Sequence, residues 1–326
     1  MRRMAARRTT SFDDKRALIT SLASRSPAEA APELRRLLAD KNGYLVGEAA
    51  RVVQELDLRD LIQDMAAAFE RLIAEGAAAD KGCLGKRHIL EALLAFDADV
   101  PRAYLAGLRH VQREPAFPQA IDTAGPIRGL SAHALVQIDH PAALLEIAPL
   151  LADPEPMVRA EGARALSRSG IEAAAAVLHL AALRGDDEID VVQACFEGLL
   201  RLGPDRYLPV VAAALAEGKH VEAAALAIGE SRSPQAFSVL RRALDEVTTP
   251  REREAVLMGM ALCRGDEATG FLLAQITSAP EGEAASALGA LSIHRHDEAL
   301  AARVRAAVAA RKSPRLTAIL GDRFGG

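Results

Sequence analysis

The chain has 326 residues, 40 of them Lys or Arg and 44 of them Asp or Glu, and a formal net charge of −4. This balance disfavours a protein whose main task is to grip a nucleic-acid backbone, because that task usually needs a clustered basic face. Hydrophobic residues make up 50% of the chain, but only 3% are aromatic and Trp is absent, so we expect a core of Ala, Leu and Val in closely packed helices.

The segment 1–27 opens with several arginines and lacks the apolar stretch of a secretory signal. We expect a flexible basic tail and lead-in here. The Arg-rich start also fits an organelle transit peptide, but Asp13 and Asp14 interrupt it. No uncharged apolar run reaches about 18 residues anywhere in the chain, so no membrane span is expected.

Repeated helix pairs begin near residue 28. The Leu-Leu-Ala-Asp ending at Asp40 returns at Asp153, and Gly47-Glu-Ala-Ala-Arg51 is similar to residues 161–164. Pro32 and Pro209 each stand inside a predicted first helix, eight positions before an acidic residue. A proline at such a place should kink the helix.

Two divergent helix pairs fill residues 58–138, one near 58–96 and one near 101–138, and each is interrupted by a longer connection. The connection from Ala77 to Gly85 is short and polar, and we interpret it as a plain loop. The connection from Arg113 to Pro126 contains three prolines and Phe117. Because long structured loops often carry function, it is either one wall of a binding surface or an irregular turn of a divergent repeat.

The clearest repeat starts at Pro141. Four apolar residues of its first helix fall on one face at helical spacing: Leu144, Leu145, Ala148 and Leu151. We expect Asp153 to cap the second helix, Pro154 to lie in its first turn, and the helix to run from Met157 to about Ser169. Gly170 then fits a left-handed cap.

Regular repeats continue to about residue 293. Boundary pairs such as Gly203-Pro204 predict helix pairs at 171–202, 204–230, 234–263 and 266–293, and a shorter terminal pair to about Leu320. Equivalent anchors recur at roughly 30 to 33 positions, the period of a helical-hairpin solenoid, at Ala163, Phe196, Leu226, Leu257 and Leu288. We therefore expect one solenoid over 28–320, with regular repeats at 141–293 and a C-terminal tail at 321–326.

Residues 150–166 read Leu-Leu-Ala-Asp-Pro-Glu-Pro-Met-Val-Arg-Ala-Glu-Gly-Ala-Arg-Ala-Leu. This segment resembles the HEAT repeat, and most of all the short bacterial form found in the phycobilisome-lyase-like HEAT proteins. The resemblance implies an all-α fold, a right-handed α-solenoid of about eight or nine helical hairpins whose second helices line the concave side. It implies no single activity, because such arrays serve as scaffolds, chromophore lyases, hydroxylases and nucleic-acid enzymes.

Catalytic and metal signatures are missing. The hydroxylases with such repeats bind iron through His-Glu dipeptides, and none of the eight histidines here is followed by Glu. His88 and Glu91 lie three positions apart on one predicted helix face and fit either half of a metal or acid–base site or an exposed polar pair. Cys83, Cys195 and Cys263 lack metal-like spacing, which indicates buried thiols in a reducing cytoplasm. We therefore expect no catalytic residue, cofactor or metal.

Charges on the predicted second helices change sign along the chain. The early ones are Arg87, Arg128, Arg159 and Arg164, and the later ones are Asp190, Glu197, Glu222, Glu254 and Glu283. If these residues face inward they would orient a partner by its charge; otherwise they solvate the helices. The candidate partner-binding surface is Arg87, His88, Glu91, Phe117, Arg128, Arg159, Arg164, Glu197, Glu222 and Glu254.

Regular repeats without catalytic groups favour a non-catalytic scaffold or adaptor that binds a protein partner along the concave face. The alternative is a bilin or tetrapyrrole lyase-isomerase, or a carrier, that holds its ligand in the groove. Nucleic-acid binding is less favoured because aromatic residues are few and the net charge is negative. The identity of the partner and the oligomeric state are left open.

Overall fold

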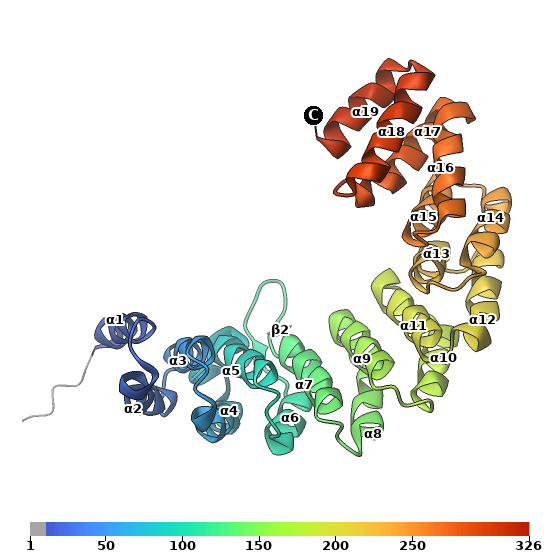
Figure 1. Cartoon of the computed structure of the whole chain (residues 1–326). Coiled ribbons are helices and arrows are strands. Elements are labelled where there is room, and N and C mark those ends of the chain that lie inside the picture. Colours follow the sequence, from blue (N-terminus) through green and yellow to red (C-terminus); the bar gives the residue numbers. More distant parts are fainter. Residues whose placement is uncertain (1–10, 326) are drawn as a thin grey trace, which may run out of the picture. The chain divides into compact units, whose positions relative to one another are not determined.

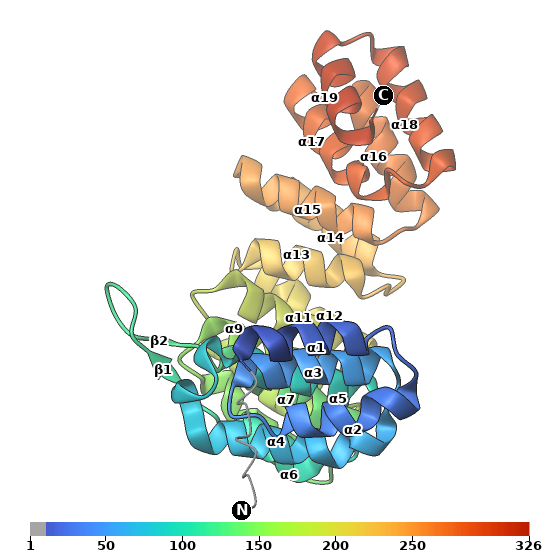
Figure 2. The ribbon, with the colours of Figure 1, turned by 90° about the vertical axis from the view of Figure 1, so that its left-hand side faces the viewer.

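The computed structural model describes residues 11–325, and this part of the chain is almost entirely helical (Figures 1 and 2). The chain forms two compact units, one ending at Ser169 and the other beginning at Gly170. Each unit is a series of helix pairs stacked side by side, so the expected all-α solenoid architecture is confirmed. The first ten residues of the expected basic tail lie outside the described residues.

The first unit contains nine α-helices and one short β-hairpin within the described residues. They are α1 (Phe12–Leu22), α2 (Pro27–Leu38), α3 (Gly43–Glu55), α4 (Ile62–Glu75), α5 (Leu84–Ala95), α6 (Pro101–Leu108), β1 (Arg113–Glu114), β2 (Ile121–Asp122), α7 (Gly125–Gln137), α8 (Ala143–Ile147) and α9 (Pro156–Arg168). The second helices of the pairs, α3, α5, α7 and α9, pack against one another in succession. They form one layer, and α2, α4, α6 and α8 form the other.

Helical structure begins earlier than the repeat pattern indicated. Part of the expected lead-in is α1, which starts at Phe12 rather than near residue 28. Ser11 and Asp14 form a capping box at its N-terminus, and Lys15 forms an ion pair with Asp40. Local capping and this contact with the first repeat explain why the lead-in is ordered.

The repeat at 141–170 differs in detail from its expected form. Its first helix is only α8, followed by a 3-10 turn at Ala148–Ala152, since Pro149 has no N–H to continue an α-helix. Leu145 is 78% exposed rather than part of the inward face. The helix α9 has Pro156, not Pro154, at its first turn, whereas Gly170 has the expected left-handed φ of 67°.

The second unit contains ten α-helices within the described residues. They are α10 (Ala174–Arg184), α11 (Ile189–Leu202), α12 (Pro204–Ala216), α13 (Val221–Glu230), α14 (Ala236–Glu246), α15 (Pro250–Leu262), α16 (Asp266–Ser278), α17 (Glu281–Leu291), α18 (Glu298–Arg311) and α19 (Pro314–Phe324). The four helix pairs expected from Pro and Gly punctuation are present. The last helix ends at Phe324, beyond the expected end near residue 320.

Second helices approach closely where glycines face a neighbouring backbone. A Cβ atom at Gly85 in α5 would lie 2.2 Å from the carbonyl oxygen of Gly43 in α3. A Cβ atom at Gly229 in α13 would lie 2.2 Å from the carbonyl oxygen of Gly259 in α15. Any larger residue would force these helices apart, so the small-residue composition sets the packing of each layer.

No helix in residues 11–325 is both long enough and apolar enough to cross a membrane.

Candidate interaction surfaces

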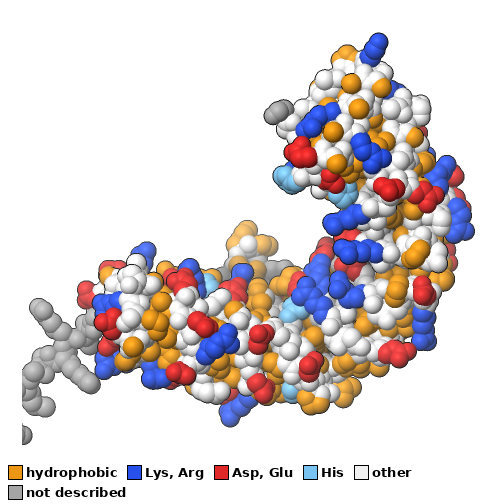
Figure 3. Space-filling model, viewed as in Figure 1, with side chains coloured by type: hydrophobic (Ala, Val, Ile, Leu, Met, Phe, Trp, Pro, Cys, Tyr) orange, Lys and Arg blue, Asp and Glu red, His pale blue; other side chains and the backbone are white. Residues whose placement is uncertain are grey.

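A β-hairpin projects from the helices of the first unit (Figure 2). Its strands pair antiparallel, with Arg113 opposite Asp122 and Glu114 opposite Ile121. Phe117 in the connecting loop is 99% exposed, and Ile121 is also exposed. Hydrophobic side chains gather on the projecting hairpin in Figure 3. An aromatic ring so fully in water has no role in the packing of this chain, and aromatic residues are enriched among the residues that dominate binding energy.

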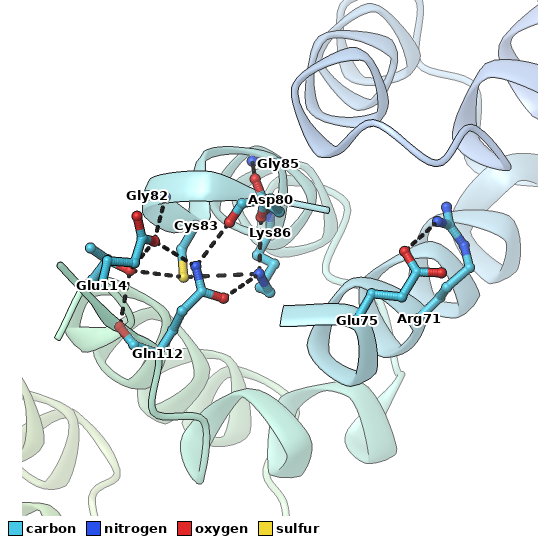
Figure 4. A network of polar contacts seen from close by, with 10 residues as sticks. Arg71, Glu75, Asp80, Gly82, Cys83, Gly85, Lys86, Gln112 and Glu114 are labelled. Carbon is cyan, nitrogen blue, oxygen red and sulfur yellow. Dashed lines mark hydrogen bonds and ion pairs between the residues drawn. The ribbon is translucent and has the colours of Figure 1, made fainter. Parts of the chain in front are cut away.

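A buried ion pair lies beside the base of this hairpin (Figure 4). The side chains of Lys86 and Asp80 are 0% and 1% exposed, and Lys86 Nζ lies 3.2 Å from Asp80 Oδ2. The Asp80 carboxylate also accepts hydrogen bonds from the backbone N–H groups of Gly85 (2.8 Å) and Lys86 (2.9 Å), at the start of α5. The Asp80 carboxylate is therefore both the counter-ion of a buried lysine and the hydrogen-bond acceptor for free N–H groups at the start of a helix.

Gln112 and Glu114 connect this ion pair to β1. Gln112 accepts a hydrogen bond from Lys86 Nζ (3.0 Å), and its amide donates to the Asp80 carbonyl (2.9 Å) and to Glu114 Oε1 (2.8 Å). Glu114 also accepts from the Gly82 N–H and from the Thr123 hydroxyl. Hydrogen bonds from Gln112, Gly82 and Thr123 hold the pKa of the Glu114 carboxyl below its ordinary value. We call Asp80, Lys86, Gln112 and Glu114 the hairpin network.

A second buried cation supports the other strand. Arg128 in α7 donates to Asp122 Oδ2 (2.7 Å) and to Asp153 Oδ1 (3.0 Å), and its side chain is 3% exposed. Burial raises the pKa of Asp122, but hydrogen bonds from the Gln112 and Ala124 N–H groups and from Arg128 outweigh it, so the pKa is lowered. The expectation that Arg128 belongs to a partner-binding surface is wrong, because its charge is enclosed and neutralised within the first unit.

The connection from Ala77 to Gly85 is more than the plain loop that its sequence indicated. It supplies Asp80 to the hairpin network and adopts left-handed backbone at Gly82 (φ 69°) and Cys83 (φ 54°). The short polar sequence of this segment indicated only a connecting loop, so the network was not predicted. The available signal was Asp80 and Lys86 flanking a Gly-rich turn, but their burial depends on residues from about 112 to 123.

From the sequence, His88 and Glu91 fitted either half of a metal or acid–base site or an exposed polar pair, and the structure gives each of them a different partner. Glu91 accepts a hydrogen bond from Arg87 (2.7 Å), and His88 Nδ1 lies 3.6 Å from Glu48 Oε1 in α3. The side chains of His88 and Glu91 thus interact with different neighbours. Arg87 stays exposed, but its charge is partly compensated on its own helix.

The arginines of α9 also have partners. Arg159 donates to the carbonyls of Asp153 and Pro154, and Arg164 donates to Glu161 Oε1 (2.8 Å). Glu161 Oε2 lies 2.7 Å from His133 Nε2 in α7. The His133 hydrogen bond, followed by that of Arg164, lowers the pKa of Glu161 to about 2. The four early arginines therefore do not add up to an uncompensated basic face in the first unit.

The later acidic residues lie on the second helices of the second unit. Arg251 donates to Glu222 (2.8 Å), Gln193 donates to Glu197 (2.6 Å), and Ser286 donates to Glu254 (3.3 Å). Glu254 and Glu283 line a groove of about 720 Å³ between residues of α15, α17 and α19. This groove also contains arginines, so its walls carry both signs of charge.

The three cysteines have the properties of structural thiols. Cys83 and Cys195 are buried and Cys263 is half-buried, and all are free. Burial raises the pKa of the Cys195 thiol to about 12 and that of Cys263 to about 11. A thiol with a raised pKa is a poor nucleophile at neutral pH. Within residues 11–325, no group of three or more His, Cys, Asp or Glu side chains is placed to hold a metal ion.

These features define an α-solenoid of helical hairpins with a projecting apolar tip and charged grooves. Residues 114–199, which run from β1 into α11, match the family model described as HEAT repeats. The match includes the segment 150–166, on which the resemblance to HEAT repeats rested. No curated protein matches the chain.

Proposed function

We propose that this protein is a non-catalytic scaffold or adaptor that binds a protein partner through the second-helix face of its repeats, with the β-hairpin as an anchor. The observation that carries the proposal is Phe117, 99% exposed on a hairpin whose base is fixed by buried charges. Burying a Lys and an Asp together costs several kcal/mol of desolvation, which their attraction offsets only when their other hydrogen bonds are also made, as they are here. A buried ion pair at its base suits a hairpin that must keep one conformation.

A preformed hairpin supports binding because little conformational entropy is lost when a partner covers it. A Phe side chain buries about 150 to 250 Å² when fully enclosed, which is a substantial fraction of one side of a standard interface. Within the first unit, the part that matches HEAT repeats, from residue 114 to the end of α9, provides helical surface beside this anchor. A partner with an apolar pocket for Phe117 and polar contacts around it fits these features.

The test is affinity purification of the tagged protein from its native cell, followed by mass spectrometry. Phe117→Ala should reduce the amount of a stoichiometric partner recovered with the protein by about tenfold or more. Truncating a central aromatic residue commonly costs about 2 kcal/mol of binding energy. Leu145→Ala is the matched control, because Leu145 is an equally apolar side chain that is 78% exposed away from the hairpin. Equal loss from both variants, or no loss from either, would contradict the proposal.

The same preparation tests the chromophore alternative. The likeness of residues 150–166 to phycobilisome-lyase-like HEAT proteins is the basis of that alternative. An absorbance scan that shows a bound pigment without a protein partner would favour a lyase or carrier. We further propose a cytoplasmic location, in keeping with the three free thiols.

A further inference from the structure

Three arginines occupy corresponding ends of successive second helices in the second unit. Arg201 is at the C-terminal end of α11, Arg232 follows α13 and Arg264 follows α15. The three side chains are exposed and line one groove of about 600 Å³. Among the described residues, none of the three is joined to a carboxylate, whereas Arg251, at the N-terminal end of α15, is paired with Glu222. Lys and Arg side chains gather along this part of the second unit in Figure 3.

Two of these arginines stand where the backbone would prefer glycine. Arg232 and Arg264 have φ of 54°, in the left-handed region, two residues after the last residue of their helices. At the corresponding position after α9 the chain has Gly170, with φ of 67°. A left-handed Arg is strained, and a helix C-terminus can be neutralised by a cation in its last turn without this strain. The arginine side chains are therefore held at both positions at a cost in backbone energy, which a binding role would explain.

The spacing of the arginines suits an extended chain. Packed helices lie about 8 to 10 Å apart, so Arg232 and Arg264, which hold the same position after neighbouring helices, are expected at about that interval. Arg201 lies on the preceding second helix, one residue before its end. A polyproline II segment rises about 3.1 Å per residue with three residues per turn. Its side chains at every third position therefore share one face and repeat at about 9 Å, one carboxylate for each arginine.

The rest of the groove favours a peptide over a nucleic acid. Its lining includes apolar side chains from Leu200, Pro204 and Leu262, against which proline rings can pack. It also includes Glu197 and Glu230, so the groove carries separate charges of both signs, which suits a ligand with spaced charges better than the continuous charge of a phosphate backbone. No aromatic residue lines it, so bases have no ring on which to stack.

We propose that Arg201, Arg232 and Arg264 bind an acidic, extended segment of a protein partner that carries a carboxylate at every third residue. The inference rests on the proposed function only in taking the ligand to be a protein. It does not involve the hairpin, which is in the other unit. Each arginine binds one carboxylate, and the apolar groove walls contact the residues between them.

The test uses the full-length protein and labelled synthetic peptides in fluorescence anisotropy at low salt. The first peptide is three Glu-Pro-Pro units, and the second has the same composition with its three Glu residues adjacent. A triple variant, Arg201→Gln, Arg232→Gln and Arg264→Gln, removes the charges of the groove. The matched control is Arg242→Gln, Arg303→Gln and Arg305→Gln, which removes the same charge from exposed positions on α14 and α18.

The wild type and the control variant should bind the spaced peptide with similar affinity, and the groove variant should bind about tenfold more weakly or worse. The peptide with adjacent Glu residues should also bind more weakly. Equal binding by the two variants, equal binding of the two peptides, or no binding by the wild type would overturn the proposal. Tighter binding of a single-stranded oligonucleotide through the same arginines would overturn it in favour of nucleic acid.

These outcomes are separate from those of the hairpin proposal. A groove variant that no longer binds the peptide should still capture a partner through Phe117. The Phe117→Ala variant should bind the spaced peptide like the wild type. A protein that captures a partner through Phe117 but ignores acidic peptides would contradict only the groove assignment.

Discussion

The two units use charge in opposite ways. The first unit buries charged side chains from Asp80, Lys86, Glu114 and Arg128, whereas the buried polar residues described in the second unit are only Ser233 and Ser313. Irregular repeats explain the difference: the connections at 77–85 and 113–126 break the apolar layers, and polar groups must then be satisfied internally. Regular repeats close almost entirely on apolar side chains and leave their charges on the surface.

The helix ends show the same contrast. Two residues beyond their last helical residue, α3, α5 and α7 have Asp57, Asp97 and Asp139, all with left-handed backbone. In the second unit α13 and α15 have Arg232 and Arg264 at that place. One structural position thus carries opposite charge in the two units, and the two arginines line the groove of about 600 Å³.

The largest expected effect is the loss of the buried pair in the first unit. Lys86→Met should lower the free energy of unfolding by about 3 to 5 kcal/mol, because the buried Asp80 carboxyl loses its counter-ion. Urea unfolding followed by circular dichroism measures this change. The control is Arg109→Ala, which removes an exposed pair with Glu146 and should cost about 1 kcal/mol or less. Similar losses in both variants would mean that the buried network does not set the stability of the first unit.

A smaller effect is expected from the contact between α7 and α9. The pKa of Glu161 is lowered to about 2 from 4.5, so its contribution to stability is complete above pH 4.5 and is lost as the pH falls toward 2. Glu161→Gln should therefore be less stable than the wild type at pH 6, by about 1 to 2 kcal/mol after allowance for solvent screening.

Thermal unfolding at pH 6, 4 and 2.5 should show this difference shrinking as the pH falls. Glu91→Gln, which breaks the more exposed pair with Arg87, is the comparison variant. A difference for Glu161→Gln that stays constant with pH would show that the carboxylate charge is not the cause.

The smallest effect is expected at the left-handed arginines of the second unit. Arg232→Gly and Arg264→Gly remove backbone strain but add freedom to the unfolded chain, so each should change stability by less than about 1 kcal/mol in either direction. The same thermal unfolding assay measures the change in stability of each variant. A loss of about 2 kcal/mol or more would mean that these side chains stabilise the fold, and would remove the argument that they are kept for binding.

Local sequence signals located the helices well. The pairs Gly203-Pro204 and Thr249-Pro250 mark real boundaries, and apolar spacing placed Phe196, Leu257 and Leu288 in the core. Phe117, which lies among prolines in an insertion and was included in the candidate surface, is exposed. These features depend on residues close in sequence, which is why they could be predicted.

Features that depend on distant residues could not be predicted in this way. Lys86 reads as an ordinary surface lysine until Gln112 is brought to it from 26 positions away. Arg128 reads as part of a basic face, but Asp122 and Asp153 enclose it. Charge patterns along one helix do not reveal which charges a neighbouring element neutralises, so residue type alone could not define the surface.

The central claim, that the hairpin is a contact point for a partner, is tested most directly by photo-crosslinking in the native cell. A photoreactive amino acid at exposed Ala116, next to an intact Phe117, should give one adduct of defined mass, and the same group at exposed Leu145 should not. Adding Phe117→Ala should remove the adduct at position 116. No adduct at Ala116, or the same adducts from both positions, would contradict the claim.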